Sequence, residues 1–282
     1  MKISFGHGGE AMEAAADEYN FPIHREPTRF AKKDYVINSY TGDVLGIVGR
    51  NQAQVSHAQF FHPITEAIEG RLGHSQQRTW VSRHGAWALR EYVFPHITST
   101  VETARRSSEV QFKALAWHGV DGLTSNNFVS GSILMWCLNT MVLGEDITRL
   151  RRKNTKNFSM ENFVETIDEA HDGFSKQIDM LRRMANSPML EAHGEQIVRE
   201  LSANDVQAEA ILSSYHDHRD QWGDNAFALY NTWTNWATYA DDRNGSVLRR
   251  TSNDNTVERL HRRSFDVAQW AASERFQLAL AA

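Results

Sequence analysis

The first half of the chain combines short alternating segments, typical of strands, with a few segments of helical pattern. Residues 8–19 are rich in Ala, Glu and Met and predict a short helix. Residues 35–48 predict two strands that form a hairpin around a glycine turn. Residues 56–70 predict a helix, with Ser56 as its N-cap and Gly70 as its end.

A second group of strand-like segments follows this helix. Residues 78–94 predict another hairpin, which turns near Gly85 and ends at Pro95 because proline cannot donate to a strand ladder. Residues 110–117 predict a further strand. Residues 130–143 are apolar enough to predict a buried helix that packs on the sheet.

From residue 160 onward, apolar residues recur at helical spacing between mostly acidic polar residues. The tryptophan-rich run 222–236 has the spacing of a helix–helix core, and a final helix is expected over residues 256–280. We therefore predict an α+β fold. Residues 1–148 would form a mostly antiparallel β-sheet with packed helices, and residues 149–282 a basic segment followed by a helical region.

Cysteine content and hydropathy indicate the cellular compartment of the protein. The 282 residues include one cysteine, Cys137, which cannot build a disulfide framework and is expected to be a small buried apolar residue. Residues 1–9 lack the apolar run of a secretory signal. No segment is apolar over the roughly 18 residues that a membrane helix needs. These features predict a cytoplasmic protein that does not contact the membrane.

The motifs of common enzyme classes are missing from the sequence. It contains no phosphate-binding loop of the Gly-x-x-x-x-Gly-Lys-Ser/Thr type and no Gly-x-Ser-x-Gly elbow. His216 and His218 lie two residues apart, which on a helix turns them about 200° away from each other. We expect no catalytic residue, no metal site and no cofactor. The alternative is a metal-dependent nucleic-acid enzyme that uses His216, His218, Asp241 or Asp242.

Charge is distributed unevenly along the chain. The net charge is −5, yet residues 71–113 have a net charge of +4 and residues 149–156 a net charge of +5. Residues 157–224 compensate with a net charge of −9. A protein with a negative total can still bind phosphate through a positive stripe on its surface.

Tryptophans alternate with the cations of the first basic block on predicted strands. Cations for phosphates and aromatic faces for bases are what single-stranded nucleic acid binding requires. The predicted DNA-binding residues are Arg71, Arg78, Arg83, Arg90, Arg105, Arg106, Lys113, Arg149, Arg151, Arg152, Lys153, Lys156, Trp80, Trp87 and Trp117. Two alternatives remain open. The tryptophans could face inward, and the run 149–156 could be a solvated loop or helix end that pairs with the acidic block.

Four motifs occur in order along the chain: a strand–turn–strand segment over residues 35–50, Cys-Leu-Asn-Thr at 137–140, the basic run 149–155, and Leu-Tyr-Asn-Thr-Trp-Thr-Asn-Trp at 229–236. In order and spacing they resemble the phage- and plasmid-borne proteins grouped as domain of unknown function nine hundred and thirty-two. The chain departs from that family at Leu138, where glutamine is usual, and at Asn154, where histidine is usual.

The element order of that family is similar to the core of single-strand annealing proteins of the Redβ, Erf and Rad-fifty-two type. This resemblance implies ATP-independent annealing of single-stranded DNA in phage recombination, carried out by a homo-oligomeric ring or filament in the infected bacterial host. It also implies a phage exonuclease or a host single-strand binding protein as partner. The remaining alternative is a structural or host-interaction phage protein.

Overall fold

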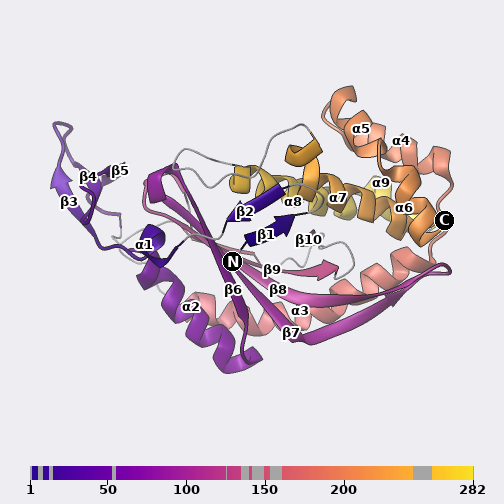
Figure 1. Ribbon diagram of the computed structural model, residues 1–282, viewed down its shortest axis with the longest axis horizontal. Helices are drawn as coiled ribbons and strands as arrows, with labels where there is room; N and C mark the ends of the chain where they lie inside the picture. Colours follow the sequence, from indigo (N-terminus) through magenta and orange to yellow (C-terminus); the bar gives the residue numbers. More distant parts are fainter. Residues whose placement is uncertain are drawn as a thin grey trace.

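The computed structural model describes the backbone of residues 2–5, 9–12, 15–52, 55–124, 126–134, 140–141, 149–152, 161–243 and 256–281. It is an α+β protein with antiparallel sheets and a helical C-terminal region, which confirms the predicted fold class. Figure 1 shows α2 and α3 along one side of the large sheet, and the C-terminal helices α4–α9 on the other side and at one end. No helix in these ranges has both the length and the hydropathy to cross a bilayer.

The strands are β1 (Lys2–Phe5), β2 (Gly9–Met12), β3 (Ile23–Pro27), β4 (Lys33–Asn38), β5 (Val44–Gly49), β6 (Gln76–Ser82), β7 (Trp87–Glu102), β8 (Ser107–Gly119), β9 (Asn126–Leu134), β10 (Thr140–Met141) and β11 (Arg149–Arg152). The helices are α1 (Ala16–Tyr19), α2 (His57–Leu72), the short turn η1 (Arg83–Gly85), α3 (Glu161–Asn186), α4 (Glu191–Leu201), α5 (Asp205–Leu212), α6 (Tyr215–Trp222), α7 (Ala226–Arg243), α8 (Thr256–Ala272) and α9 (Glu274–Ala281).

The large sheet has the strand order β10, β9, β8, β7, β6, and β11 pairs with β9 as well. Helices α2 and α3 pack on one face of it. Phe60 of α2 and Phe174 of α3 share a buried core with Phe112 of β8, and the rings of Phe112 and Phe174 lie 5.3 Å apart. On the other face the ring of Trp117 contacts Phe265 of α8. Burial of these aromatic rings stabilises this layer.

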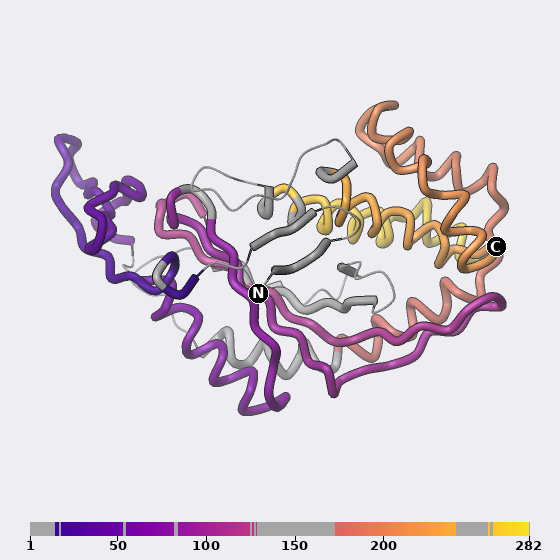
Figure 2. The backbone as a smooth tube through the Cα atoms, in the orientation of Figure 1, coloured from indigo at the N-terminus to yellow at the C-terminus, as the bar shows by residue number. Residues whose placement is uncertain are grey.

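The small sheet β3–β4–β5 lies at one end of the molecule, away from the helical region, and has its own core (Figure 2). Val36 and Val48 are buried against Ala86 and Val120, which lie where strands of the large sheet end. The glycine turn expected between the two strands is present, with Gly42 at φ 76°. The predicted 35–48 hairpin is therefore confirmed.

The helical region is built around α7. Trp222, Trp233 and Tyr230 are fully buried, and Trp233 packs 5.0 Å from the ring of Phe276 of α9. The prediction that the tryptophan-rich run forms a helix–helix core is confirmed. The final helix differs from the prediction because Ser273 separates α8 from α9.

The predicted helix over residues 130–143 is wrong where the structure describes it. Residues up to Leu134 continue strand β9, and Thr140–Met141 pairs with that strand. A short apolar run fits a buried strand as well as a buried helix, and here β8 on one edge and β10 and β11 on the other take up the backbone hydrogen bonds. Cys137 lies outside the described residues.

The predicted helix over residues 8–19 is also wrong in part. Gly9–Met12 forms strand β2, which pairs with β1, and only Ala16–Tyr19 is helical. The helix propensities of Ala, Met and Glu amount to only fractions of a kcal/mol per residue. Pairing of this segment with β1 is enough to override them. Tertiary pairing therefore outweighs local propensity in this segment.

Two predicted boundaries shift. Helix α2 begins after Ser56, whose side chain accepts from the backbone N–H of Gln59 as expected of an N-cap, but it ends at Gly73 rather than Gly70. Gly73 has φ 82°, a conformation that favours glycine. Strand β7 continues through Pro95, because β6 pairs only as far as Val93 and the register with β8 shifts just after Phe94. The missing N–H of Pro95 therefore costs no ladder bond.

Candidate nucleic-acid interface

The basic run begins as a strand. Arg149–Arg152 forms β11, antiparallel to β9, with Arg149 opposite Val129 and Arg151 opposite Asn127. The expectation of a solvated loop or helix end is wrong for these four residues. Lys153 and Lys156 lie outside the described residues, as do the side chains of Arg149, Arg151 and Arg152. Among the described strands β11 pairs only with β9, so the basic run sits at the edge of the sheet.

Strand registers bring the backbone of the basic strand β11 into line with that of Trp80 and Trp117. Directly opposed residues lie side by side in neighbouring strands, and one row of backbone positions runs from β6 to β11 through Trp80, Leu89, Trp117, Asn127 and Arg151. Neighbouring strands are about 4.8 Å apart, so the Arg151 backbone lies roughly 10 Å from that of Trp117. The sequence does not reveal this proximity because it depends on which strand pairs with β9.

The three tryptophans predicted to meet bases are buried. Trp80, Trp87 and Trp117 have relative exposures of 5%, 3% and 7%. Phe265 of α8 covers part of this face at Trp117. The expectation that these rings are available for stacking is wrong in this structure, and the alternative that they face inward holds. Strand alternation cannot distinguish the two cases when helices cover both faces of a sheet.

Lys113 is not a surface cation either. Its side chain is buried in β8, and Nζ donates a 2.7 Å hydrogen bond to Glu91 of β7. The register places Lys113 beside Val93, two residues from Glu91, so the pair bridges diagonally across the two strands. A buried lysine needs such a carboxylate, and this requirement explains why Lys113 turns inward.

Three more of the predicted cations are engaged within the protein. Arg90 donates to Thr79 at 3.0 Å, and its guanidinium lies 4.6 Å from the centre of the Phe61 ring. The other two, Arg105 and Arg106, lie at the tip of the β7–β8 hairpin. The guanidinium of Arg106 lies 5.5 Å from the ring of Trp222.

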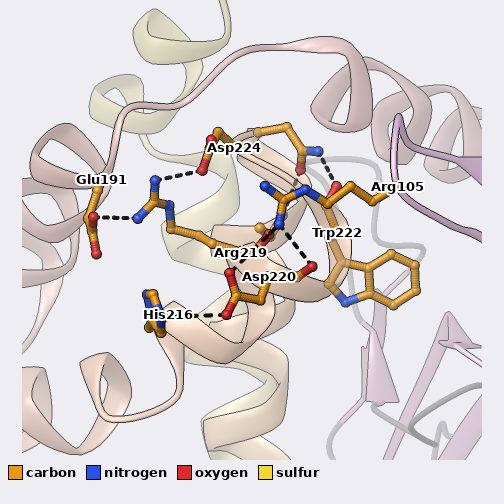
Figure 3. A network of polar contacts seen from close by, with 9 residues as sticks. Arg105, Glu191, His216, Arg219, Asp220, Trp222 and Asp224 are labelled. Carbon is orange, nitrogen blue, oxygen red and sulfur yellow. Dashed lines mark hydrogen bonds and ion pairs between the residues drawn. The ribbon is translucent and has the colours of Figure 1, made fainter.

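Arg105 ties this hairpin to the end of helix α6, as Figure 3 shows. It donates to the carbonyl oxygens of Arg219 and Asp220, at 3.1 and 3.0 Å. The last carbonyls of a helix lack partners within the helix and carry partial negative charge, so an arginine there stabilises the helix end. In the same network Arg219 bridges Glu191 and Asp224. These contacts give Arg105 a structural role.

The remaining cations of the first block are more accessible. Arg71 is exposed in the last turn of α2, and Arg78 is half-buried in β6 opposite Glu91. Arg83 starts the η1 turn, and its side chain lies outside the described part. The structure therefore does not bring the cations of residues 71–113 together as one exposed surface.

A buried histidine pair joins helix α2 to strand β8. His57 Nε2 donates to the carbonyl of Gly85 at 2.7 Å, since a carbonyl can only accept. His57 Nδ1 must then accept from His118 Nδ1, 2.9 Å away. Burial lowers the pKa of His57 to about 4, and burial with the neighbouring His57 holds the pKa of His118 well below its ordinary value. Both rings are neutral at neutral pH.

The two histidines of the metal hypothesis lie on different sides of α6. His216 is exposed and lies 3.5 Å from Asp220, whereas His218 is buried on the other side of α6. The side chains of Asp241 and Asp242 lie outside the described part. Across the side chains that the structure does describe, no three His, Cys, Asp or Glu come close enough to hold a metal ion.

Sequence reasoning missed a cluster of cations in the turn between β3 and β4. Arg29, Lys32 and Lys33 are exposed there around Phe30. The signal in the sequence is three cations within the five residues 29–33. Comparison of the chain with protein-family models, with curated proteins and with solved structures finds no match.

Proposed function

We propose that the protein binds single-stranded DNA and anneals complementary strands without ATP. The observation that supports this most directly is the basic strand β11. In a strand, residues two apart lie about 6.6 Å from each other on the same side, so the positions of Arg149 and Arg151 suit contact with two phosphates of one extended DNA strand. The resemblance to phage- and plasmid-borne proteins and to single-strand annealing proteins points the same way.

Annealing requires no chemistry from the protein. A protein that holds the sugar–phosphate backbone extended, with base edges exposed, lets complementary strands pair. The buried tryptophans leave the cations as the main contribution, so binding should depend on salt and tolerate any sequence.

We also propose that the active form is a homo-oligomer. A subunit with a net charge of −5 and only one short basic strand gains avidity when several such strands line up along one DNA molecule. Phage recombination in the cytoplasm of the bacterial host, with an exonuclease or host single-strand binding protein nearby, is the setting that we propose.

The test combines three measurements on the purified protein. Fluorescence polarisation with a labelled thymidine oligonucleotide should show binding that weakens with salt. Two complementary oligonucleotides should anneal faster with the protein, without ATP or added metal. Electron microscopy should show rings or filaments, with DNA or without it. A protein that assembles but has no affinity for DNA at low salt would instead favour a structural or host-interaction role.

A further inference from the structure

The turn between β3 and β4, residues 28–33, is held by its own hydrogen bonds. We call it the basic turn. The Thr28 hydroxyl accepts from the backbone N–H of Phe30 at 3.0 Å and donates to the carbonyl of Lys33 at 2.9 Å. The Lys32 carbonyl accepts from the N–H of Arg50, which follows strand β5. These bonds fix the backbone that presents the side chains of the turn.

Within the described part of the chain, the cations of the basic turn have no acidic partners. No carboxylate in the described part of the chain lies within ion-pair distance of Arg29, Lys32 or Lys33. Other cations of the same sheet are engaged, since Arg50 pairs with Asp34 at 3.2 Å and Arg25 donates to the carbonyl of Gln52. Three unpaired cations in five residues repel one another, and a bound anion would relieve this repulsion.

An aromatic ring stands among these cations. Phe30 is 47% exposed, and the guanidinium of Arg29 lies 5.1 Å from the centre of its ring. Nearly half of the Phe30 residue is accessible to solvent, which leaves ring surface for contact with a second planar group. The small sheet also exposes Tyr40, Val44 and Ile47.

The backbone of Lys32 provides an independent indication. Lys32 has φ 63°, a left-handed conformation in which glycine or asparagine is far more common than lysine. A residue kept in an unfavourable conformation suggests that its side chain is needed for something other than folding. Here the side chain is a solvent-exposed ammonium.

We propose that the basic turn is a contact site for single-stranded DNA. Arg29, Lys32 and Lys33 contact successive phosphates, and one base stacks on Phe30. Cations combined with an exposed ring are the arrangement that single-strand binding uses. The charge of the turn favours DNA over an apolar protein partner. This inference rests on the proposed function and adds a second contact region at the end of the molecule far from the helical region (Figure 1).

The test compares two triple variants with equal loss of charge. One is Arg29→Ala/Lys32→Ala/Lys33→Ala. The matched control, Lys176→Ala/Arg183→Ala/Arg262→Ala, removes three exposed cations from α3 and α8. Binding of a labelled thymidine oligonucleotide is measured from 50 to 400 mM salt, a range of about one decade that suits counterion analysis.

The turn variant should lower the log–log salt slope by about 2 and weaken binding about 100-fold at 0.1 M salt, since each single-strand contact contributes roughly 0.7 to the slope. The control should bind like the wild type. If the turn variant binds as well as the control while the wild type binds tightly, the inference is overturned and the proposed function stands. If the wild type does not bind the oligonucleotide at any salt, both are overturned.

Two single variants separate binding from folding. Lys32→Gly should leave the melting temperature unchanged or raise it, because glycine adopts this backbone conformation without strain, and should still weaken binding. Phe30→Ala should weaken binding severalfold at all salt concentrations without changing the slope, and Phe30→Tyr should restore it. If Lys32→Gly and Phe30→Ala bind the oligonucleotide like the wild type, these two side chains do not contact DNA.

Discussion

Lys113 and Glu91 form an ion pair inside the large sheet, with Nζ 2.7 Å from Oε1 and with side-chain exposures of only 2% and 9%. The pair joins the central strands β7 and β8. Because the pair is buried, Lys113 is not part of the proposed DNA surface, to which the sequence assigned it.

Replacing Lys113 by Met should therefore affect folding and not DNA binding. The substitution leaves the Glu91 carboxylate buried without its ammonium, so the free energy of unfolding should fall by about 3–5 kcal/mol in urea titrations. The double variant Lys113→Met/Glu91→Leu should recover most of this loss because no buried charge remains. A single variant as stable as the wild type but with a reduced salt slope for DNA would contradict this assignment.

Arg105 should also matter for stability alone. In Arg105→Ala the carbonyls of Arg219 and Asp220 lose the arginine donor, although that of Arg219 still accepts from the N–H of Gly223, and the β7–β8 hairpin loses its tie to the helical region. The free energy of unfolding should fall by about 1–2 kcal/mol, with DNA affinity unchanged. The exposed Arg183 is a suitable control, because Arg183→Ala should change stability by less than about 0.5 kcal/mol.

The buried pair of His57 and His118 should make the protein sensitive to mild acid. Both folded-state pKa values are lowered, that of His57 to about 4, while an unfolded histidine titrates near 6.5. The unfolded state thus binds more protons below pH 6.5. Stability is full above that pH and falls as the pH drops toward 4, by about 1.4 kcal/mol per pH unit for each histidine.

Urea titrations between pH 7.5 and 5.0 measure this slope. A His57→Gln/His118→Gln variant should be less stable at neutral pH but should lose most of the pH dependence. The control is His62→Gln, since His62 is exposed beside Glu66 and should leave the slope as in the wild type. An equal slope in wild type and double variant would show that other groups govern the acid response.

The basic strand is tested by Arg151→Ala/Arg152→Ala/Lys153→Ala. If these cations contact phosphates, the salt slope should flatten by about 2 and binding should weaken equally on any sequence. In that case the melting temperature should barely move, because cations that contact DNA rather than the protein contribute little to folding. If the run instead pairs with the acidic residues 157–224, the melting temperature should fall and the affinity for DNA should not change. One salt series and one melting curve distinguish these outcomes.

The sequence determined the elements whose signals are local. The 35–48 hairpin follows from alternation around a glycine turn, the start of α2 from the Ser56 cap, and the core of α7 from aromatic residues at helical spacing. In each case residues within a few positions of one another carry the information, so the pattern survives without tertiary contacts.

Tertiary structure decided which chemical groups reach solvent. Residues 130–134 are a strand because β8 and β10 pair with them, and Lys113 turns inward because Glu91 lies across the ladder. Trp117 is buried because α8 covers its face. Pairing register and coverage join residues far apart in the chain, and local periodicity contains no information about them.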